Sequence, residues 1–443
     1  MMRRFSRAAV TAAVATAVVT GTAGWASDTA QRPVTGPPPG TEAWRSDRSL
    51  GRALPDPGSA SPGEVAAFFK NLTEVQRQRL SARHPFVVGN LDGAPVSLRY
   101  RANALARGAL GSGSDGRQIL VYDPRGRGQL AEVFGDLARA RRVAVVVPGS
   151  DIDAGTFDRT REMARSLYEA ANDPGDRDGG AASPDRASSG AWTGAGDDRA
   201  EDGPANAVNP KGTSNIGNTG KAGKAASPED TGTGHAGRTL TAGRTPDSRT
   251  ADSRTTDSRT AEGRTGKDSA GSVPAGNGPT GTVAVIAWAG YTTPVGVGLD
   301  AAAGDLAEAG AERLARFTRG VAATGAARPA LFCHSYGSVV CGLAAERAGA
   351  TDIVALGSPG MRADTVADLH TGARVWAAKA PSDWISKVPN VEFAGLGHGT
   401  DPTAPEFGAR RVPAGDTAGH AGYFAPGTSS LRAFASIARG AAR

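Results

Sequence analysis

Short apolar runs alternate with amphipathic stretches from Arg142 onward, and this alternation is the strongest constraint on the fold. The runs are Val143 to Val147, Val283 to Trp288, Ala330 to Cys333, Ile353 to Leu356 and Val375 to Ala378. Strands that are apolar throughout are typical of a parallel sheet covered by helices on both faces. Helical spacing at Thr156 to Ala171 and Asp300 to Ala323 supplies two crossovers. We therefore expect a mostly parallel, doubly wound α/β sheet.

The residues before these strands have a different pattern. Gln118 to Tyr122 and Gln129 to Phe134 flank a turn rich in Pro and Gly, which predicts an amino-terminal hairpin. Ser61 to Phe69 and Thr73 to Arg83 are predicted to be short helices because each begins with a Ser or Thr cap, followed by Glu64 or Glu74. A turn is expected at Val87 to Gly93.

Residues 173–280, between the first two core strands, cannot contribute to a core. They almost lack large apolar side chains and contain Asp-Ser-Arg-Thr at positions 247, 252 and 257. Such a segment cannot bury enough apolar surface to offset the entropy lost on ordering. We expect a long disordered insert that can be deleted without loss of the fold.

The amino terminus has the form of a secretory signal peptide. Three arginines within the first seven residues precede an Ala/Val/Thr run from Ala8 to Val19, and cleavage is expected before Ser27. The run is too short to cross a bilayer. We expect a secreted or cell-envelope protein without a stable membrane span.

The expected organisation has five parts. Residues 1–26 form the signal peptide, and residues 27–84 form a lead-in that is extended up to residue 60 and then helical. The α/β domain is divided into residues 85–172 and 281–443 by the insert at 173–280.

The net charge and the two cysteines limit which partners and which redox state can be expected. Without the three signal arginines the formal net charge falls from +6 to +3, which does not indicate a nucleic-acid partner. Cys333 and Cys341 lie on the predicted strand and the following helix. Each is expected to be buried rather than bridged, so that the fold does not depend on a disulfide.

The stretch Pro329 to Gly349 predicts a strand, a sharp turn and a helix. At the turn lies Cys-His-Ser-Tyr-Gly, residues 333–337, which is similar to G-x-S-x-G with Cys333 at the first Gly position. Small residues on both sides allow the strained serine to present its hydroxyl. Ser335 is therefore the candidate nucleophile, although a serine that caps a buried helix would produce the same pattern.

The candidate base and acid follow the nucleophile in the chain. His420 lies between a predicted last strand, Ala409 to Val412, and a terminal helix, Ser429 to Ala438, where the base is expected in the order Ser, acid, His. Asp383 follows an apolar strand at the rim where Ser335 emerges. Asp401 is the alternative acid, although its surroundings of Gly and Pro indicate a turn.

The other histidines suit this role less well. His84 lies in the helical lead-in and His235 lies in the insert. His334 adjoins the nucleophile and should point away from it, and His370 is expected on a solvated helix. His398 remains the alternative base.

Two backbone donors are needed for an oxyanion. We expect them to be the N–H groups of Ser150, in the Gly-bent loop after the first core strand, and of Tyr336. A plain turn at Pro148-Gly149 would explain that loop equally well. No metal or organic cofactor is expected.

Five segments together resemble an actinobacterial α/β-hydrolase domain family whose function is unassigned. They are residues 90–95 (NLDGAP), 146–151 (VVPGSD), 288–291 (WAGY), 333–337 (CHSYG) and 420–423 (HAGY). The resemblance implies the α/β-hydrolase fold and a Ser-Asp-His arrangement on Ser335, Asp383 and His420. It implies no particular substrate.

These observations favour an exported serine hydrolase that cleaves an acyl ester through an acyl-enzyme. Only a short helix fits between Gly357 and Arg374, so a large lid is not expected, and an open cleft would suit small or surface-presented acyl esters. Two alternatives stay open. One is an acyltransferase that acts on cell-envelope alcohols, and the other is a catalytically silent, hydrolase-like envelope binding protein.

Overall fold

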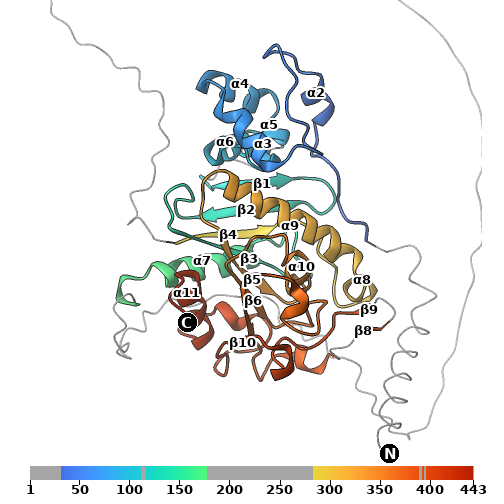
Figure 1. The fold of residues 1–443 in the computed structure, drawn as a ribbon, viewed down its shortest axis with the longest axis vertical. Coiled ribbons are helices and arrows are strands. Elements are labelled where there is room, and N and C mark those ends of the chain that lie inside the picture. The colour runs from blue at the N-terminus through green and yellow to red at the C-terminus, as the bar shows by residue number, and fades with distance from the viewer. Residues whose placement is uncertain (1–30, 111–115, 177–282, 389–391, 394–395, 443) are drawn as a thin grey trace, which may run out of the picture. The chain divides into compact units, whose positions relative to one another are not determined.

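The computed structural model describes residues 31–110, 116–176, 283–388, 392–393 and 396–442 (Figure 1). The expected signal peptide at 1–26 and all but the first four residues of the expected insert at 173–280 lie outside the described residues. Those four include the short 3-10 helix η1 (Pro174–Asp176), which follows α7.

A mixed sheet forms the centre of the domain, in the order β1-β2-β4-β3-β5-β6-β7-β10. Its strands are β1 (Ile119–Asp123), β2 (Gln129–Phe134), β3 (Arg142–Val147), β4 (Val283–Ala289), β5 (Pro329–His334), β6 (Asp352–Leu356), β7 (Arg374–Ala378) and β10 (Arg410–Arg411). β1 and β2 form an antiparallel hairpin, β2 also pairs antiparallel with β4, and the remaining pairs are parallel. The predicted α/β sheet with an amino-terminal hairpin is confirmed.

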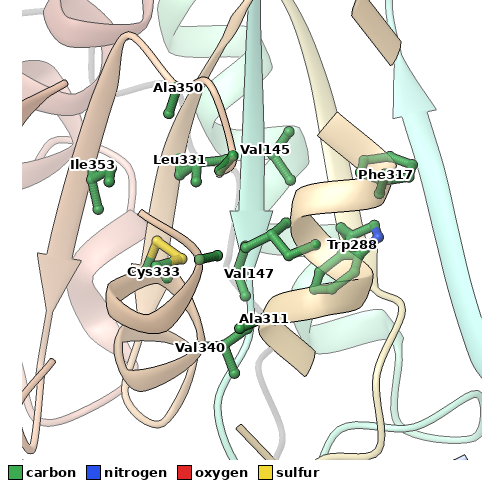
Figure 2. Packing of buried hydrophobic residues seen from close by; sticks show 14 of the residues in the cluster. Val145, Val147, Trp288, Ala311, Phe317, Leu331, Cys333, Val340, Ala350 and Ile353 are labelled. Atoms are coloured by element: carbon green, nitrogen blue, oxygen red, sulfur yellow. A yellow bond between two sulfur atoms is a disulfide. The ribbon is translucent and has the colours of Figure 1, made fainter. Parts of the chain in front are cut away.

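Successive residues of the central strands point to opposite faces of the sheet, and helices cover both faces. On one face, Val145 and Val147 of β3 pack with α9 (Asp305–Ala323) and α10 (Gly337–Ala344), as Figure 2 shows. On the other face, Val146 packs with α7 (Asp158–Asn172) and α11 (Ser429–Ala438). This two-sided burial explains why the strands are apolar throughout.

The predicted helix at 300–323 is divided in the structure. α8 (Leu299–Ala302) ends at Ala303, whose backbone is extended, and α9 begins after Gly304. The predicted last strand, 409–412, is reduced to the two residues of β10. Between β6 and β7 the chain forms the 3-10 helix η2 (Ala367–Leu369), and β8 (Glu392–Phe393) pairs with β9 (Leu396–Gly397) beyond β7.

The amino-terminal helices form a separate apolar cluster. They are α2 (Thr41–Ser46), α3 (Pro62–Lys70), α4 (Glu74–Arg83), α5 (Pro85–Asn90) and α6 (Val96–Ala109). The two predicted helices are confirmed as α3 and α4, each with a capping box, but α4 uses Gln76 rather than Glu74 as the partner of Thr73. None of the helices in the described ranges is long and apolar enough to cross a membrane.

Three expectations for this region need correction. The turn expected at 87–93 is mostly helix α5, because Pro85 starts a helix and Val87 and Val88 are buried in the cluster. α2 lies within the segment expected to be extended. α6 was not predicted, since its buried face includes the polar residues Arg99 and Asn103, which interrupt the apolar periodicity.

Cys333 and Cys341 form a disulfide, so the expectation that they are unbridged was wrong. The chain reverses at Ser335, which brings α10 back along β5 and leaves the two Cα atoms 6.4 Å apart. That separation is within the range that a disulfide requires. The bridge joins the strand and the helix on either side of the candidate nucleophile.

Candidate active site

Ser335 lies in the turn between β5 and α10, and the surrounding structure holds its backbone in an unusual conformation. Its φ of 53° is in the left-handed region, which residues other than glycine rarely adopt. Its amide donates to the carbonyl of Leu356 at 2.9 Å, and its carbonyl accepts from the hydroxyl of Ser338 at 2.6 Å. The turn is thus held both by β6 and by α10, and it leaves the Ser335 side chain partly exposed.

Small residues let the backbone segments around this turn approach closely. A Cβ on Gly337 would lie 2.5 Å from the carbonyl oxygen of Val147, and a Cβ on Gly149 would lie 2.6 Å from Cβ of Ser335. Neither position has room for a side chain. The loop after β3 therefore passes directly beside the candidate nucleophile.

The predicted oxyanion donors lie in the two segments that adjoin Ser335. Within the described chain, neither the amide of Ser150 nor that of Tyr336 donates a hydrogen bond. The loop that carries Ser150 is anchored, because the buried Tyr291 hydroxyl donates to the Pro148 carbonyl at 2.8 Å. Backbone N–H groups that are held in place and unpaired are suited to stabilising a developing oxyanion.

His420 and Asp383 form a hydrogen-bonded pair. His420 lies in the loop before the 3-10 helix η5 (Gly422–Phe424), and Asp383 precedes the 3-10 helix η3 (Trp384–Lys387) after β7. Nδ1 of His420 is 2.8 Å from Oδ1 of Asp383. Because the carboxylate binds Nδ1, the other ring nitrogen, Nε2, remains for proton exchange with a reacting group.

Asp383 is buried and makes further hydrogen bonds. Its Oδ1 accepts from the amide of Ile385 at 2.9 Å, and its Oδ2 accepts from the hydroxyl of Tyr423 at 2.6 Å. Burial alone would raise the pKa of Asp383, but the bonds from His420, Tyr423 and Ile385 outweigh it and hold the pKa below the usual range. The carboxylate is therefore charged at neutral pH.

Two rings pack against His420. The ring centroids of His334 and Trp384 lie 4.6 Å and 4.7 Å from that of His420. Burial lowers the pKa of His334 to about 3, so its ring is neutral at pH 7. Its Nε2 lies 2.7 Å from the His420 carbonyl oxygen and donates to it.

Gly357, at the end of β6, gives the pair the space it needs. Its φ is 54°, and a Cβ there would lie 2.8 Å from Oδ2 of Asp383 and 3.1 Å from Nδ1 of His420. Any side chain at this position would displace the carboxylate or the imidazole.

The hydroxyl of Ser335 makes no hydrogen bond to His420 in the part of the chain that the structure describes. The two residues nevertheless belong to one cluster, because His334 precedes Ser335 directly and contacts His420. A bond between nucleophile and base is often long without substrate and shortens when substrate binds.

The alternative residues have other partners. Asp401 forms an ion pair with Lys379 and accepts from the amide and hydroxyl of Thr403 at 2.8 Å each, which is the turn-stabilising role that its sequence context indicates. His398 is buried, with Nε2 2.6 Å from the carbonyl of Ala301.

The remaining histidines of the described ranges lie elsewhere. His84 pairs with Asp47, and His370 is exposed at the end of η2 rather than on the helix expected there. His235 lies outside the described residues. Among the residues described, no group of three or more His, Cys, Asp or Glu side chains could hold a metal ion.

Sequence reasoning missed Tyr423, Trp384 and Gly357 as members of this cluster. Tyr423 belongs to the His-Ala-Gly-Tyr segment that the resemblance singled out, so a signal for it was present. Trp384 and Gly357 carried no signal beyond their positions after predicted strands.

Comparisons with known proteins agree with the fold described above. A family model described as alpha/beta hydrolase matches residues 123–215 and 239–393, which is more than half of the chain. The match includes Ser335 and Asp383 and ends before His420. No solved structure matches.

Two uncharacterized proteins from two strains of Mycobacterium tuberculosis are each 29% identical to this chain over 422 residues. The alignments cover 87% of this chain and 57% of each relative. The chain thus spans little more than half the length of these curated relatives. The expected likeness to actinobacterial proteins of unassigned function is confirmed.

Proposed function

This chain belongs to the alpha/beta hydrolase family, and on that premise we propose that it is a serine hydrolase that cleaves carboxylic esters. The observation that carries the proposal is the contact between His420 and the buried Asp383, beside the strained turn that presents Ser335. A serine that only capped a buried helix would not need a backbone in the left-handed region. It would also not need a hydrogen-bonded pair of Asp383 and His420 next to it.

In the proposed first step, Oγ of Ser335 attacks the ester carbonyl carbon while Nε2 of His420 takes the hydroxyl proton. Asp383 stabilises the resulting imidazolium and fixes the ring through Nδ1. The carbonyl oxygen becomes an oxyanion, for which the amides of Ser150 and Tyr336 are the proposed donors. When the intermediate collapses, the bond to the alcohol breaks and His420 returns the proton to the leaving oxygen.

In the second step, water attacks the acyl-enzyme and gives its proton to Nε2 of His420. The acid is released and Ser335 recovers its proton. An alcohol in place of water would give acyl transfer by the same steps, so product analysis with and without an alcohol acceptor distinguishes hydrolysis from transfer.

We also propose that the protein is exported. The disulfide between Cys333 and Cys341 supports this proposal, because disulfides persist mainly in oxidising compartments outside the cytosol. Immunodetection in culture supernatant and envelope fractions tests it, and protein confined to the cytosol would contradict it.

The enzymatic proposal is tested by labelling with a fluorophosphonate and by ester turnover. Wild-type protein should be labelled on Ser335 and should hydrolyse a short activated ester, while Ser335→Ala should lose both by several orders of magnitude with the fold intact. A folded wild-type protein that is neither labelled nor active would favour the catalytically silent alternative.

A further inference from the structure

Exposed apolar side chains are concentrated at the rim that holds the candidate site. Within the described ranges, the large hydrophobic residues that are exposed are Val75, Leu105, Leu110, Val295, Val297, Leu299 and Trp384. The last four lie on two segments that follow β4 and β7. These strands are parallel to β5, so both segments leave the sheet at the edge where Ser335 lies.

The segment Val295 to Leu299 lies between two contacts with residues near Ser335. Before it, the carbonyl of Pro294 accepts from the amide of Asp151, the residue after Ser150, at 2.9 Å. After it, the carbonyl of Ala303 accepts from the hydroxyl of Tyr336 at 3.3 Å. The exposed stretch therefore begins beside the loop that carries Ser150, one of the two proposed oxyanion donors.

Within this stretch the apolar side chains are well exposed. Val295 and Val297 are 55% and 70% exposed, and Gly296 between them donates its amide to the Asp151 carboxylate at 2.8 Å. The backbone is thus held against the loop after β3 while the side chains face solvent.

Trp384 lies on the acid–base side of the site. It follows Asp383 directly, packs on the His420 ring and is 41% exposed. Exposed apolar side chains therefore lie both beside the loop that carries Ser150 and beside the proposed base. Apolar groups gathered around a polar cleft commonly mark the place where an apolar ligand binds.

We infer that Val295 to Leu299 and Trp384 form an acyl-binding wall, so that the preferred substrates are esters of medium or long unbranched acyl chains. This inference rests on the proposed function and adds the substrate class to it. The occupant is the acyl chain, because one apolar segment adjoins the loop of the proposed donor Ser150 and the other packs on the proposed base His420. The described chain between β6 and β7 forms only η2 and the loops around it, and within the described ranges these side chains are exposed.

The expected chain-length effect follows from methylene burial. A methylene fully removed from water favours binding about fourfold, and one that is half covered by an open wall favours it about twofold. Wild-type kcat/KM should therefore rise about 16-fold from p-nitrophenyl butyrate to the octanoate, measured below the concentration at which the octanoate forms micelles. Combining Val295→Ser, Val297→Ser and Leu299→Ser should reduce that ratio to about threefold or less.

The chain offers a matched control. Combining Val75→Ser, Leu105→Ser and Leu110→Ser alters three exposed apolar residues on or just after the amino-terminal helices α4 and α6, and it should leave the octanoate-to-butyrate ratio unchanged. Val297→Ser alone, at the most exposed position, should lower the ratio in part. For Trp384→Ala only the octanoate-to-butyrate ratio is informative, because loss of the contact between Trp384 and His420 also changes the absolute rate.

The possible outcomes separate the two proposals. A wild-type enzyme that labels on Ser335 and cleaves all chain lengths equally would refute the acyl-binding wall and leave the hydrolase intact. An equal loss of ratio in both triple variants would refute it too. If light scattering shows that the wild type is a dimer and that the triple variant of Val295, Val297 and Leu299 is a monomer, the segment is a contact between copies and the inference is wrong. A wild-type protein that is neither labelled nor active would contradict the proposed hydrolase function itself, and with it the acyl-binding wall.

Discussion

Tyr423→Phe is the most informative single change outside the proposed catalytic residues. The Tyr423 side chain is fully buried, and its hydroxyl donates to Oδ2 of Asp383 at 2.6 Å while it accepts from the amide of Ala380 at 2.9 Å. Phenylalanine keeps the packing and removes only the oxygen. The variant therefore tests whether Tyr423 holds the acid in position for His420.

The two lost hydrogen bonds set the magnitude. A hydrogen bond to a charged group contributes about 1.5–3 kcal/mol, and a buried amide left without an acceptor costs about 1–3 kcal/mol. Asp383 keeps its bonds to the Ile385 amide and to His420. We expect kcat/KM to fall about 10- to 100-fold, less than the ~10⁴-fold loss known when a serine protease loses its carboxylate. The free energy of unfolding should fall by about 2–5 kcal/mol.

The pH dependence gives a second readout. The pKa of Asp383 is lowered in the folded protein, so its ionisation contributes stability above its unfolded pKa of about 4, and this is lost as pH falls through the folded pKa. Without the Tyr423 donor, burial is opposed less and the pKa of Asp383 rises. In urea unfolding and kcat/KM profiles from about pH 2 to pH 8, the variant should lose stability and activity at higher pH than the wild type.

Tyr100→Phe is the matched control. The Tyr100 hydroxyl is buried and has no hydrogen-bond partner among the described residues, so its removal should change neither activity nor the pH profile. If Tyr423→Phe leaves kcat/KM within twofold of wild type at every pH while its stability falls, Tyr423 is structural only and the positioning argument is wrong.

Four further variants test other parts of the site. Asp383→Asn should lower turnover by about 10⁴-fold with the fold retained, whereas Asp401→Asn should weaken only a turn, and the reverse result would make Asp401 the acid. Gly357→Ala should lower kcat far more than it raises KM, because the methyl group would contact Asp383 and His420. Unchanged kcat would contradict that geometry. Replacing both members of the Cys333–Cys341 disulfide by Ala should lower the unfolding free energy by about 2–3 kcal/mol in urea titrations, as expected for so short a loop, and an unchanged midpoint would argue against a stabilising bridge.

The sequence by itself determined the elements whose signals are local. Apolar runs predicted the central strands because their residues are buried on both faces, and Ser and Thr caps predicted α3 and α4. The strand, turn and helix around Ser335 were also predicted from the sequence, because small residues must flank a serine with a strained backbone. Burial and steric exclusion restrict which residue types can stand at neighbouring positions. Secondary structure can therefore be predicted at such positions without knowledge of distant parts of the chain.

Only the tertiary structure decided which distant residues meet. The sequence left Asp383 and Asp401 as rival acids, and the choice depends on the distance from His420, which lies 37 positions from Asp383. The disulfide likewise depends on how α10 returns along β5. Tyr423 contacts Asp383 because the loop after β10 brings η5 against the end of β7, an approach set by the sheet order. Pairings of this kind are fixed by distances across the fold, and a one-dimensional pattern contains no measure of them.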